Sequence, residues 1–392
     1  METVKILRLT AFSILLSFFT LEGMAQDPNL PPSGNFDLTH WKITLPDQSE
    51  VGENELSSGF ESANEFYTDP VTGAMVFRCR NDAETGGSKF PRSELREMLR
   101  AGNTSIPTQG VGRNNWVFSS SSQSAQDASG AVDGILSATL AVDHVSTTGE
   151  SSKVGRVIVA QIHASDNEPC RLYYRKLPGN ELGSIYIAHE PNTTAEEWYE
   201  MIGSRSSSAS NPADGIALGE VFSYEIEVEG NTLTVTIIRD GKPDVVQVVD
   251  MSNSGFEDDW MYFKAGNYNQ NDSGDAGDYA QVSFYELDVF HEEIVTGIDE
   301  LIQESYSRVY PNPSSSRFTI EYELNQRSDV ELSVYNAWGQ KIEILAEGTQ
   351  NAGKQIAEWY PEASLANGYY FAVLRIGAET KTFRMALGSE KN

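Results

Sequence analysis

The sequence predicts an all-β protein in which a β-sandwich of the jelly-roll type is followed by a smaller β-sandwich. Two observations support this prediction. Short runs of alternating apolar and polar residues recur along the 392-residue chain, separated by Gly, Asn, Asp and Ser, while helical periodicity is scarce. The runs YEIEVEG and TLTVTIIRDG also flank Gly230–Asn231, a dipeptide that favours a tight hairpin turn.

The strands of the larger unit, residues 35–290, are expected to be short and to end at turn residues. The serine-rich segment Ser119–Ser129 is expected to form a loop. The expected strands are Trp41–Leu45, Ala74–Arg80, Gly134–Val142, Gly155–His163, Gly183–His189, Val221–Glu229, Thr232–Arg239, Trp260–Gln270 and Tyr279–Phe290.

The strand pattern stops near His291, and a second unit begins after an acidic segment. We interpret residues 291–306 as a linker and residues 307–392 as a small β-sandwich. Gly377–Ala378 is expected to close its last hairpin. The expected strands of this unit are Arg317–Leu324, Val330–Asn336, Tyr369–Ile376 and Lys381–Leu387.

The N-terminus has the layout of a secretory signal peptide. Lys5 and Arg8 precede an apolar run at residues 9–19, and the small residue Ala25 follows shortly after that run. The run is too short for a transmembrane helix. We therefore expect a signal peptide at residues 1–25, cleaved after Ala25, and a polar linker at residues 26–34.

Composition limits the possible classes of function. Hydrophobic residues make up 39% of the chain and charged residues 22%, so a packed core is expected. The net charge of −29 argues against nucleic acid as a partner, because phosphate binding requires a basic surface. Cys79 and Cys170 lack the spacing of a metal or redox motif, and both a disulfide and two buried thiols remain open. We expect a monomer.

Three segments place unusual polar side chains on one face of a strand. In PRSELREML, alternation puts Arg92, Glu94 and Arg96 on one side and Leu95 on the other. The carboxylate can orient the two guanidinium groups into a cationic patch. A ladder of surface salt bridges is the alternative interpretation.

The second segment is VIVAQIH, in which Gln161 and His163 share one face at the end of an apolar strand. A structural histidine and a histidine in a functional site both fit this pattern. A metal site is not indicated, because no second His or Cys lies at ligand spacing.

The third segment is YFKAGNYNQ. Its residues Tyr262, Lys264, Gly266, Tyr268 and Gln270 point one way, and the residues between them point toward the core. The glycine would let a ligand approach the backbone closely. A solvated strand face with a half-buried tyrosine is the alternative.

Together the three segments supply a set of side chains suited to removing a carbon-bound proton beside a carboxylate. Arg and Gln would neutralise the carboxylate as charge builds up on it, while His and Tyr would accept and donate protons. Residues 78–100 carry six basic and four acidic side chains, and residues 151–180 carry five basic and two acidic ones. These basic islands would hold an anionic ligand locally.

PRSELRE, QIH and YFKAGNYNQ resemble, in order, the three signature blocks of the alginate lyases of polysaccharide lyase family 7, and FDLTHWKITLP resembles that family's first strand. The resemblance covers roughly residues 35–290. It implies a β-jelly roll with a concave cationic groove. It also implies that the groove binds alginate, a polyuronate, and cleaves it by β-elimination without a required metal or other cofactor.

The resemblance further implies a role for each matching residue. Arg92, Gln161 and His163 would neutralise the C6 carboxylate at the cleaved site. Tyr268 would protonate the leaving glycosidic oxygen, and would also act as base where the C5 proton lies on its side, as at mannuronate. His163 would be the base for the opposite face, as at guluronate. The residues expected to support or bind substrate are Glu94, Arg96, Lys264 and Gln270.

Two single residues carry further implications. In the family, QIH tends to accompany activity on guluronate-containing blocks and QVH a preference for mannuronate, so Ile162 implies activity on guluronate or mixed blocks. Asn267 departs from the family, which usually has a branched aliphatic residue before its second tyrosine. Alternation predicts that the Asn267 side chain points away from the groove.

The second unit resembles a type IX secretion C-terminal sorting domain in VYPNPSSSRFTIEYEL, VYNAWGQKI and LANGYYFAVLRIGAETKTFRMAL. This implies export across a Gram-negative outer membrane by the secretion machinery, followed by release or surface attachment. A small carbohydrate-binding module is the alternative, in which aromatic side chains stack on sugar. Those side chains are Trp338, Trp359, Tyr369 and Tyr370.

Other functions of the larger unit also remain open. It could be a lyase acting on another polyuronate such as glucuronan, or a polyuronate-binding protein without activity. A glycoside hydrolase is disfavoured, because it needs two carboxylates and the three strand faces carry only Glu94, which arginines flank.

Overall fold

The computed structural model describes residues 26–292 and 308–388, with gaps at 313, 325–326, 337–339, 363, 366–367 and 377–378. These residues form two compact units. The expected signal peptide and most of the linker expected at residues 291–306 lie outside the described residues. Within the described part of the chain, no helix is both long and apolar enough to cross a membrane.

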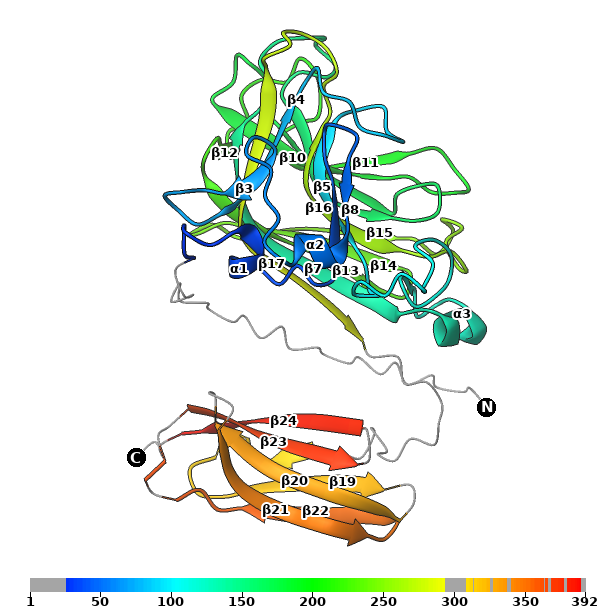
Figure 1. Ribbon diagram of the computed structural model, residues 1–392, viewed down its shortest axis with the longest axis vertical. Coiled ribbons are helices and arrows are strands. Elements are labelled where there is room, and N and C mark those ends of the chain that lie inside the picture. Colours follow the sequence, from blue (N-terminus) through cyan, green and yellow to red (C-terminus); the bar gives the residue numbers. More distant parts are fainter. Residues whose placement is uncertain are drawn as a thin grey trace, which may run out of the picture. The chain divides into compact units, whose positions relative to one another are not determined.

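The larger unit is a sandwich of two mainly antiparallel sheets (Figure 1). In spatial order, the first sheet consists of β11 (Glu197–Ile202), β10 (Leu182–His189), β9 (Cys170–Arg175), β8 (Arg156–His163), β16 (Tyr262–Asn269), β5 (Arg92–Glu97), β1 (Trp41–Thr44) and β2 (Glu50–Val51), with β12 (Ile216–Ala217) beside β10. The second sheet consists of β15 (Val245–Asp250), β14 (Thr232–Ile238), β13 (Val221–Glu229), β7 (Ala131–His144), β17 (Tyr279–Glu292), β4 (Met75–Arg80) and β3 (Phe66–Thr68), with β6 (Trp116–Val117) parallel to β7.

Apolar side chains at alternate positions of the two sheets meet in one core. Leu95, Ile162 and Phe263 project inward from the first sheet, and Phe77 and Phe284 do so from the second. Burial of each such side chain contributes about 1.5–3 kcal/mol. Because alternate residues point to opposite faces, the outer face of the first sheet is left to the polar side chains of β5, β8 and β16.

The strands predicted from turn residues are largely confirmed. β13 and β14 form the expected hairpin, in which Glu229 pairs with Thr232 across Gly230–Asn231. Gly230 has a φ of 58°, a left-handed conformation that glycine adopts at little cost. The expected strands did not include the short strands β2, β3, β6 and β12, nor the longer strands β9, β11 and β15. The sequence of β9, CRLYYR, is buried on both faces, so it lacks the alternation on which the prediction relied.

The helices of the described residues are short. They are α1 (Pro32–Asn35), α2 (Glu53–Leu56) and α3 (Gln123–Ala128). Helix α3 corrects the prediction that the serine-rich segment is only a loop; the Gln126 amide donates to the carbonyls of Ser119 and Ser121 at 3.0 and 2.9 Å and closes the turn. The segment at 26–34, expected as a linker, contacts the sandwich, because Gln26 donates to the Tyr285 carbonyl and Pro32 is buried.

The smaller unit is a second sandwich with its own core. One of its described sheets consists of β18 (Arg308–Tyr310), β19 (Phe318–Leu324) and β22 (Gly353–Trp359). The other consists of β21 (Lys341–Gln350), β20 (Ser328–Asn336), β23 (Gly368–Ile376) and β24 (Glu379–Leu387). Trp359 and Tyr370 are buried in this core, so these two rings do not form a sugar-stacking surface. Trp338, the side chain of Tyr369 and the turn expected at 377–378 lie outside what the structure describes.

Both cysteines are free thiols buried in the larger unit. Cys79 lies on β4 and Cys170 on β9, in different sheets. Burial raises the pKa of Cys170 to about 12 and that of Cys79 well above its ordinary value. This arrangement favours two unreactive core thiols over the disulfide.

A buried histidine–glutamate pair connects β17, the last strand of the larger unit, to β5. The His291 ring bonds through Nδ1 to the Asp133 carbonyl at 2.6 Å, and its Nε2 lies 2.6 Å from Glu97 Oε1. The Trp116 indole donates to the other oxygen of Glu97 at 3.1 Å. Burial alone would lower the pKa of His291, but the Glu97 carboxylate and the two hydrogen bonds outweigh it and raise that pKa.

Replacing His291 by Gln should lower the free energy of unfolding by about 3 kcal/mol, because Glu97 would keep a buried charge without its partner. Since the folded pKa of His291 is raised, its stabilisation is complete below the unfolded pKa of about 6.5 and is lost as the pH rises through the folded pKa. Chemical denaturation of both proteins across this range should therefore show a difference that shrinks with rising pH.

The matched control is Arg80→Ala, which removes an exposed ion pair with Asp82. It should change the free energy of unfolding by less than about 1 kcal/mol. A His291→Gln difference that is constant with pH would contradict the assigned charge of this pair.

Candidate active site

Strands β5, β16 and β8 are neighbours in the first sheet (Figure 1). Strand alternation places their predicted site residues on its outer face. Side chains directly opposite each other on paired strands have Cβ atoms about 4.5–5.5 Å apart. The opposed pairs are Arg92 with Tyr268, Glu94 with Gly266, Arg96 with Lys264, Gln161 with Lys264, and His163 with Tyr262. Residues from three distant parts of the sequence therefore form one cluster.

The Glu94 carboxylate is the centre of the cluster and is 1% exposed. Lys264 Nζ forms a close ion pair with one carboxylate oxygen, and Gln161 Nε2 donates to the other. Arg92 Nη1 lies 3.8 Å from Glu94 Oε2. Burial lowers the pKa of Lys264 to about 8, although the Glu94 carboxylate acts to raise it. These contacts contradict the alternative of a ladder of surface salt bridges.

The Tyr268 hydroxyl lies beside Arg92 at one end of the cluster. Tyr268 Oη is 2.7 Å from Ser88 Oγ, and the guanidinium carbon of Arg92 is 5.4 Å from the centroid of the tyrosine ring. Burial raises the pKa of Tyr268, so its hydroxyl keeps its proton at neutral pH and can donate it. Among the described residues, the buried Arg92 Nε has no hydrogen-bond partner, which leaves it available to an anionic ligand.

The His163 ring is held in one orientation and one protonation state. Its Nδ1 lies 2.7 Å from the Ala164 carbonyl, an acceptor, so Nδ1 carries the ring proton and Nε2 carries the lone pair. The ring also stacks on Tyr262, with centroids 5.1 Å apart. Burial and the positive charge of Lys264 lower the pKa of His163 to about 3. The imidazole is therefore neutral at neutral pH and can accept a proton at Nε2.

Glu168, which the sequence analysis missed, faces His163 from the loop between β8 and β9. Its Oε1 lies 3.4 Å from His163 Nε2. Burial, opposed by Arg171 and reinforced by Glu190, raises the pKa of Glu168 to about 7. The signal in the sequence was an acidic residue five positions after the histidine, which alternation along a strand does not detect.

Arg96 and Gln270 differ in whether their side-chain hydrogen-bond donors have partners among the described residues. Arg96 donates to the carbonyls of Glu97 and Thr108, at 2.7 and 2.9 Å, and to Asn115 Oδ1 at 2.8 Å. Its guanidinium carbon also lies 3.9 Å from the Tyr262 ring centroid. By contrast, within the described residues Gln270 Nε2 is buried without a partner.

An irregularity in β16 precedes Tyr268. The register with β8 shifts between Ala265 and Tyr268, and Gly266 has a φ of 138°. A Cβ at Gly266 would lie 2.8 Å from the Ser93 carbonyl oxygen, so only glycine fits without a shift.

Asn267 points inward, as alternation predicted, and it is completely buried. Its amide donates to the carbonyls of Phe77 at 3.2 Å and Ala280 at 2.7 Å, both in the second sheet. These hydrogen bonds connect the two sheets directly behind Tyr268. They satisfy the donor group of this buried amide, while among the described residues Asn267 Oδ1 has no hydrogen-bond partner.

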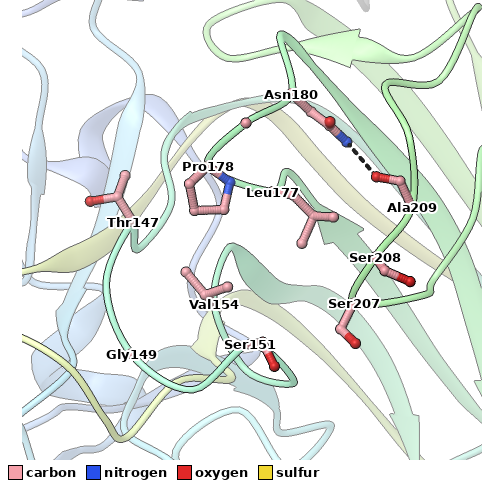
Figure 2. A pocket seen from close by; sticks show the side chains of 11 residues that line it. Thr147, Gly149, Ser151, Val154, Leu177, Pro178, Asn180, Ser207, Ser208 and Ala209 are labelled. Carbon is pink, nitrogen blue, oxygen red and sulfur yellow. Dashed lines mark hydrogen bonds between the residues drawn. The ribbon is translucent and has the colours of Figure 1, made fainter.

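A cavity of about 410 Å³ lies apart from these residues (Figure 2). Its lining includes Leu177, Pro178 and small polar residues, and Asn180 Nδ2 donates to the Ala209 carbonyl at 3.3 Å. Its lining, as far as the structure describes the chain, includes no titratable side chain. Over the described ranges, no group of three or more His, Cys, Asp or Glu side chains is arranged to hold a metal ion.

The outer face of the first sheet therefore combines three chemical capabilities. Arg92 and Gln161 can hold a carboxylate. The neutral His163 can accept a proton, and the protonated Tyr268 can donate one. All of these residues were singled out in the sequence, and the structure brings them together.

Comparison with known families divides the chain in the same two parts. The family model "Alginate lyase" matches residues 36–291, and the model "Secretion system C-terminal sorting domain" matches residues 308–387. These matches confirm both resemblances seen in the sequence.

Individual relatives agree with the family match. An alginate lyase of Klebsiella pneumoniae is 48% identical over an alignment of 296 positions, which covers 70% of this chain and 95% of the relative. The crystal structure of the alginate lyase from that organism matches with a TM-score of 0.66 and 47% identity, covering 67% of this chain and 99% of that one.

Two further crystal structures share the β-jelly roll. A variant of the family 7 alginate lyase A1-II′, in complex with the product GGG, is 27% identical with a TM-score of 0.50, covering 67% of this chain and all of that one. The exolytic PL7 alginate lyase AlyA5 of Zobellia galactanivorans is 24% identical with a TM-score of 0.54, covering 67% and 98%, and shows likeness of fold alone. The predicted jelly-roll fold is confirmed.

Replacing Glu94 by Gln should lower the pKa of Lys264 further below about 8, by about one unit or more, because the carboxylate is what opposes the effect of burial. The measurement is the pH dependence of Lys264 acylation, followed by peptide mass spectrometry. The exposed Lys242 serves as an internal control in the same sample and should not change. An unchanged Lys264 titration would show that Glu94 does not hold this ammonium group.

Proposed function

The chain belongs to the alginate lyase family, and we propose that it is a secreted lyase that cleaves alginate by β-elimination at guluronate-containing blocks. The observation that carries the proposal is the convergence of Arg92, Gln161, His163 and Tyr268 on three adjacent strands. In the reaction, the C5 proton is removed, the C4–O glycosidic bond breaks, and a C4=C5 double bond forms at the new uronate end.

Neutralisation of the substrate carboxylate is the first requirement of this chemistry. The negative charge that develops when C5 loses its proton spreads onto the C6 carboxylate, so donors placed there stabilise the transition state. Arg92 supplies a guanidinium whose Nε is unused within the described residues. Gln161 supplies the second N–H of its amide, because Glu94 accepts the first.

The proton acceptor and donor follow from the ionisation states of the two remaining residues. His163 is neutral with its lone pair on Nε2, so it takes the C5 proton. Tyr268 has a raised pKa, so it gives its hydroxyl proton to the leaving O4. A tyrosine that retains its proton is a poor base, which supports His163 as the base and therefore guluronate as the preferred sugar. The residues QIH support the same preference through the family resemblance.

The other predicted residues act by positioning or by binding. Glu94 holds Lys264 and Gln161, and Arg96 supports Tyr262, on which the His163 ring stacks. Gln270, two positions beyond Tyr268 on the same face, has an unused amide that would bind a neighbouring sugar.

The sorting domain at residues 308–387 supports export of the enzyme. We propose that the signal peptide is removed near Ala25, that the type IX machinery of a Gram-negative cell carries the chain across the outer membrane, and that the enzyme acts as a monomer, released or attached to the surface.

Two alternatives use the same cluster of residues. A lyase acting on another polyuronate would release unsaturated product from glucuronan rather than from alginate, and a polyuronate panel followed by ultraviolet absorbance separates the two. A binding protein without activity would retain alginate and release no unsaturated product. The absence of product from alginate, polyguluronate and polymannuronate would reject the main proposal.

Replacing Tyr268 by Phe should reduce kcat about 10²–10⁴-fold, the usual effect of losing a general acid, while the thermal midpoint changes little. Ultraviolet absorbance of the product on polyguluronate measures the loss. Tyr262→Phe is the matched control, since it removes a hydroxyl from the same face of the same strand, and should reduce kcat far less. Equal losses in the two variants would contradict the role of Tyr268.

The acidic limb of the pH profile of kcat/KM should report Glu168 and not His163. His163 remains neutral down to about pH 3, whereas Glu168 takes up a proton near pH 7. Once protonated, Glu168 can donate to Nε2 across the 3.4 Å contact and occupy the lone pair that the reaction needs. Activity on polyguluronate should therefore fall as the pH drops through about 7.

Glu168→Ala tests this positioning role. It should lower the maximal kcat, because the carboxylate no longer stabilises the imidazolium, and it should remove the limb near pH 7. The charged neighbours that also act on Glu168 are Arg171, Glu190 and Lys264, and they remain in the variant. A limb that persists near pH 7 would assign that titration to another group.

A further inference from the structure

A second pocket lies on the same sheet face, beside the proposed site of cleavage. Its volume is about 470 Å³, and its charged and aromatic lining is Arg156, Arg175, Arg205, Tyr186, Trp198 and Glu200. Arg156 is two residues from Ile158, which pairs with Tyr268 across the β16–β8 ladder. The pocket therefore begins about 7 Å along β8 from the strand position opposite Tyr268.

Among the described residues, the arginines of this pocket have no carboxylate partner. Arg156 and Arg175 lie directly opposite each other on β8 and β9, an arrangement in which like charges repel. Over the described residues, neither of them nor Arg205 forms a salt bridge, and the buried Nε atoms of Arg156 and Arg175 have no hydrogen-bond partner. An anion between these side chains would remove the repulsion and satisfy the unused donors.

The single carboxylate of the pocket is engaged with its own loop. Glu200 Oε1 accepts from Ser204 Oγ at 2.8 Å and from the Arg205 backbone N–H at 2.9 Å. Arg175, which is 95% buried, donates to the carbonyls of Arg205 and Ser151 at 2.7 Å each. Arg175 therefore holds two walls of the pocket in place, while the side chains of Arg156 and Arg205 remain for a ligand.

Aromatic side chains connect this pocket to Tyr268. Tyr173 and Tyr186 stack with centroids 4.9 Å apart, Trp198 lies 5.4 and 5.9 Å from them, and Tyr268 packs against this cluster. The Arg205 guanidinium carbon lies 4.6 Å from the Trp198 ring centroid. An aromatic floor with a few convergent cationic donors is typical of a site for a ligand that has both an apolar face and a negative charge.

We propose that this pocket is a distal subsite that binds the carboxylate of a uronate unit other than the one being cleaved. The assignment rests on the proposed function, since it takes the ligand to be the same polyuronate chain. Arg156 and Arg205 bind the carboxylate, Trp198 and Tyr186 contact the sugar ring, and Arg175 positions the walls. Uronate chains long enough to reach from Tyr268 to Trp198 gain affinity from this pocket.

Arg205→Ala tests the subsite through the dependence of KM on substrate length. The substrates are oligoguluronates of increasing length, from the shortest that is cleaved up to the polymer. In the wild type, KM should fall once the oligomer reaches the pocket. The variant should lose that gain, about tenfold, the value of a lost hydrogen bond to a charged group. Lys242→Ala, which removes a positive charge outside the pocket and the cleavage site, is the matched control and should keep the wild-type dependence.

A binding measurement separates this proposal from the proposed function. Calorimetry with saturated oligoguluronates on Tyr268→Phe, with and without Arg205→Ala, should show about tenfold weaker binding of long oligomers in the double variant and equal binding of short ones. Equal binding of all lengths, or competition by inorganic phosphate without any dependence on oligomer length, would overturn the subsite. If the wild type binds long oligomers through Arg205 and yet releases no unsaturated product, the subsite stands and the proposed lyase activity fails.

Discussion

The buried contact of Glu94 with Lys264 and Gln161 is the interaction on which the rest of the site depends. It joins β5, β16 and β8 at the centre of the first sheet. A buried ion pair of this kind adds little net stability, because desolvation cancels most of the Coulombic gain. Its effect is on orientation: the carboxylate holds an ammonium group in the sheet interior and directs the Gln161 amide so that one N–H remains for a ligand.

Period-two alternation was sufficient to assign the faces of these strands, because the side-chain directions of a strand follow from the backbone alone. The same rule placed Leu95 and Phe263 in the core. Register between strands was not predictable, since it depends on the irregularities at Gly266 and in β8 near Ile158. Without register, neither the contacts of Glu94 nor the hydrogen bonds that Arg96 makes within the protein can be derived. Glu168 was missed for a different reason: it lies in a loop, where no periodicity applies.

Asn267 departs from the family pattern and supports the site from the core side of the sheet. The irregular backbone at Gly266 interrupts the regular ladder next to Tyr268, and the amide of Asn267 bonds to two carbonyls of the opposite sheet. An aliphatic residue would fill the same space but would fix the backbone only by packing. Hydrogen bonds have directional geometry, so they constrain both the rotation and the position of the strand that carries Tyr268.

A net charge of −29 is compatible with a polyanionic substrate, because repulsion by the acidic surface and attraction by the arginines of the site act over different distances. At physiological ionic strength the Debye length is about 8 Å, so most of the acidic surface is screened from a chain lying on the outer face of the first sheet. Arg92, Arg156 and Arg205 would act within contact distance of a bound chain, and the partial burial of Arg92 and Arg156 limits screening there. In the proposed site these arginines lie on both sides of Tyr268 along the sheet, so attraction would be confined to a track across the strands, and the repulsive surface around that track would disfavour other orientations of the substrate.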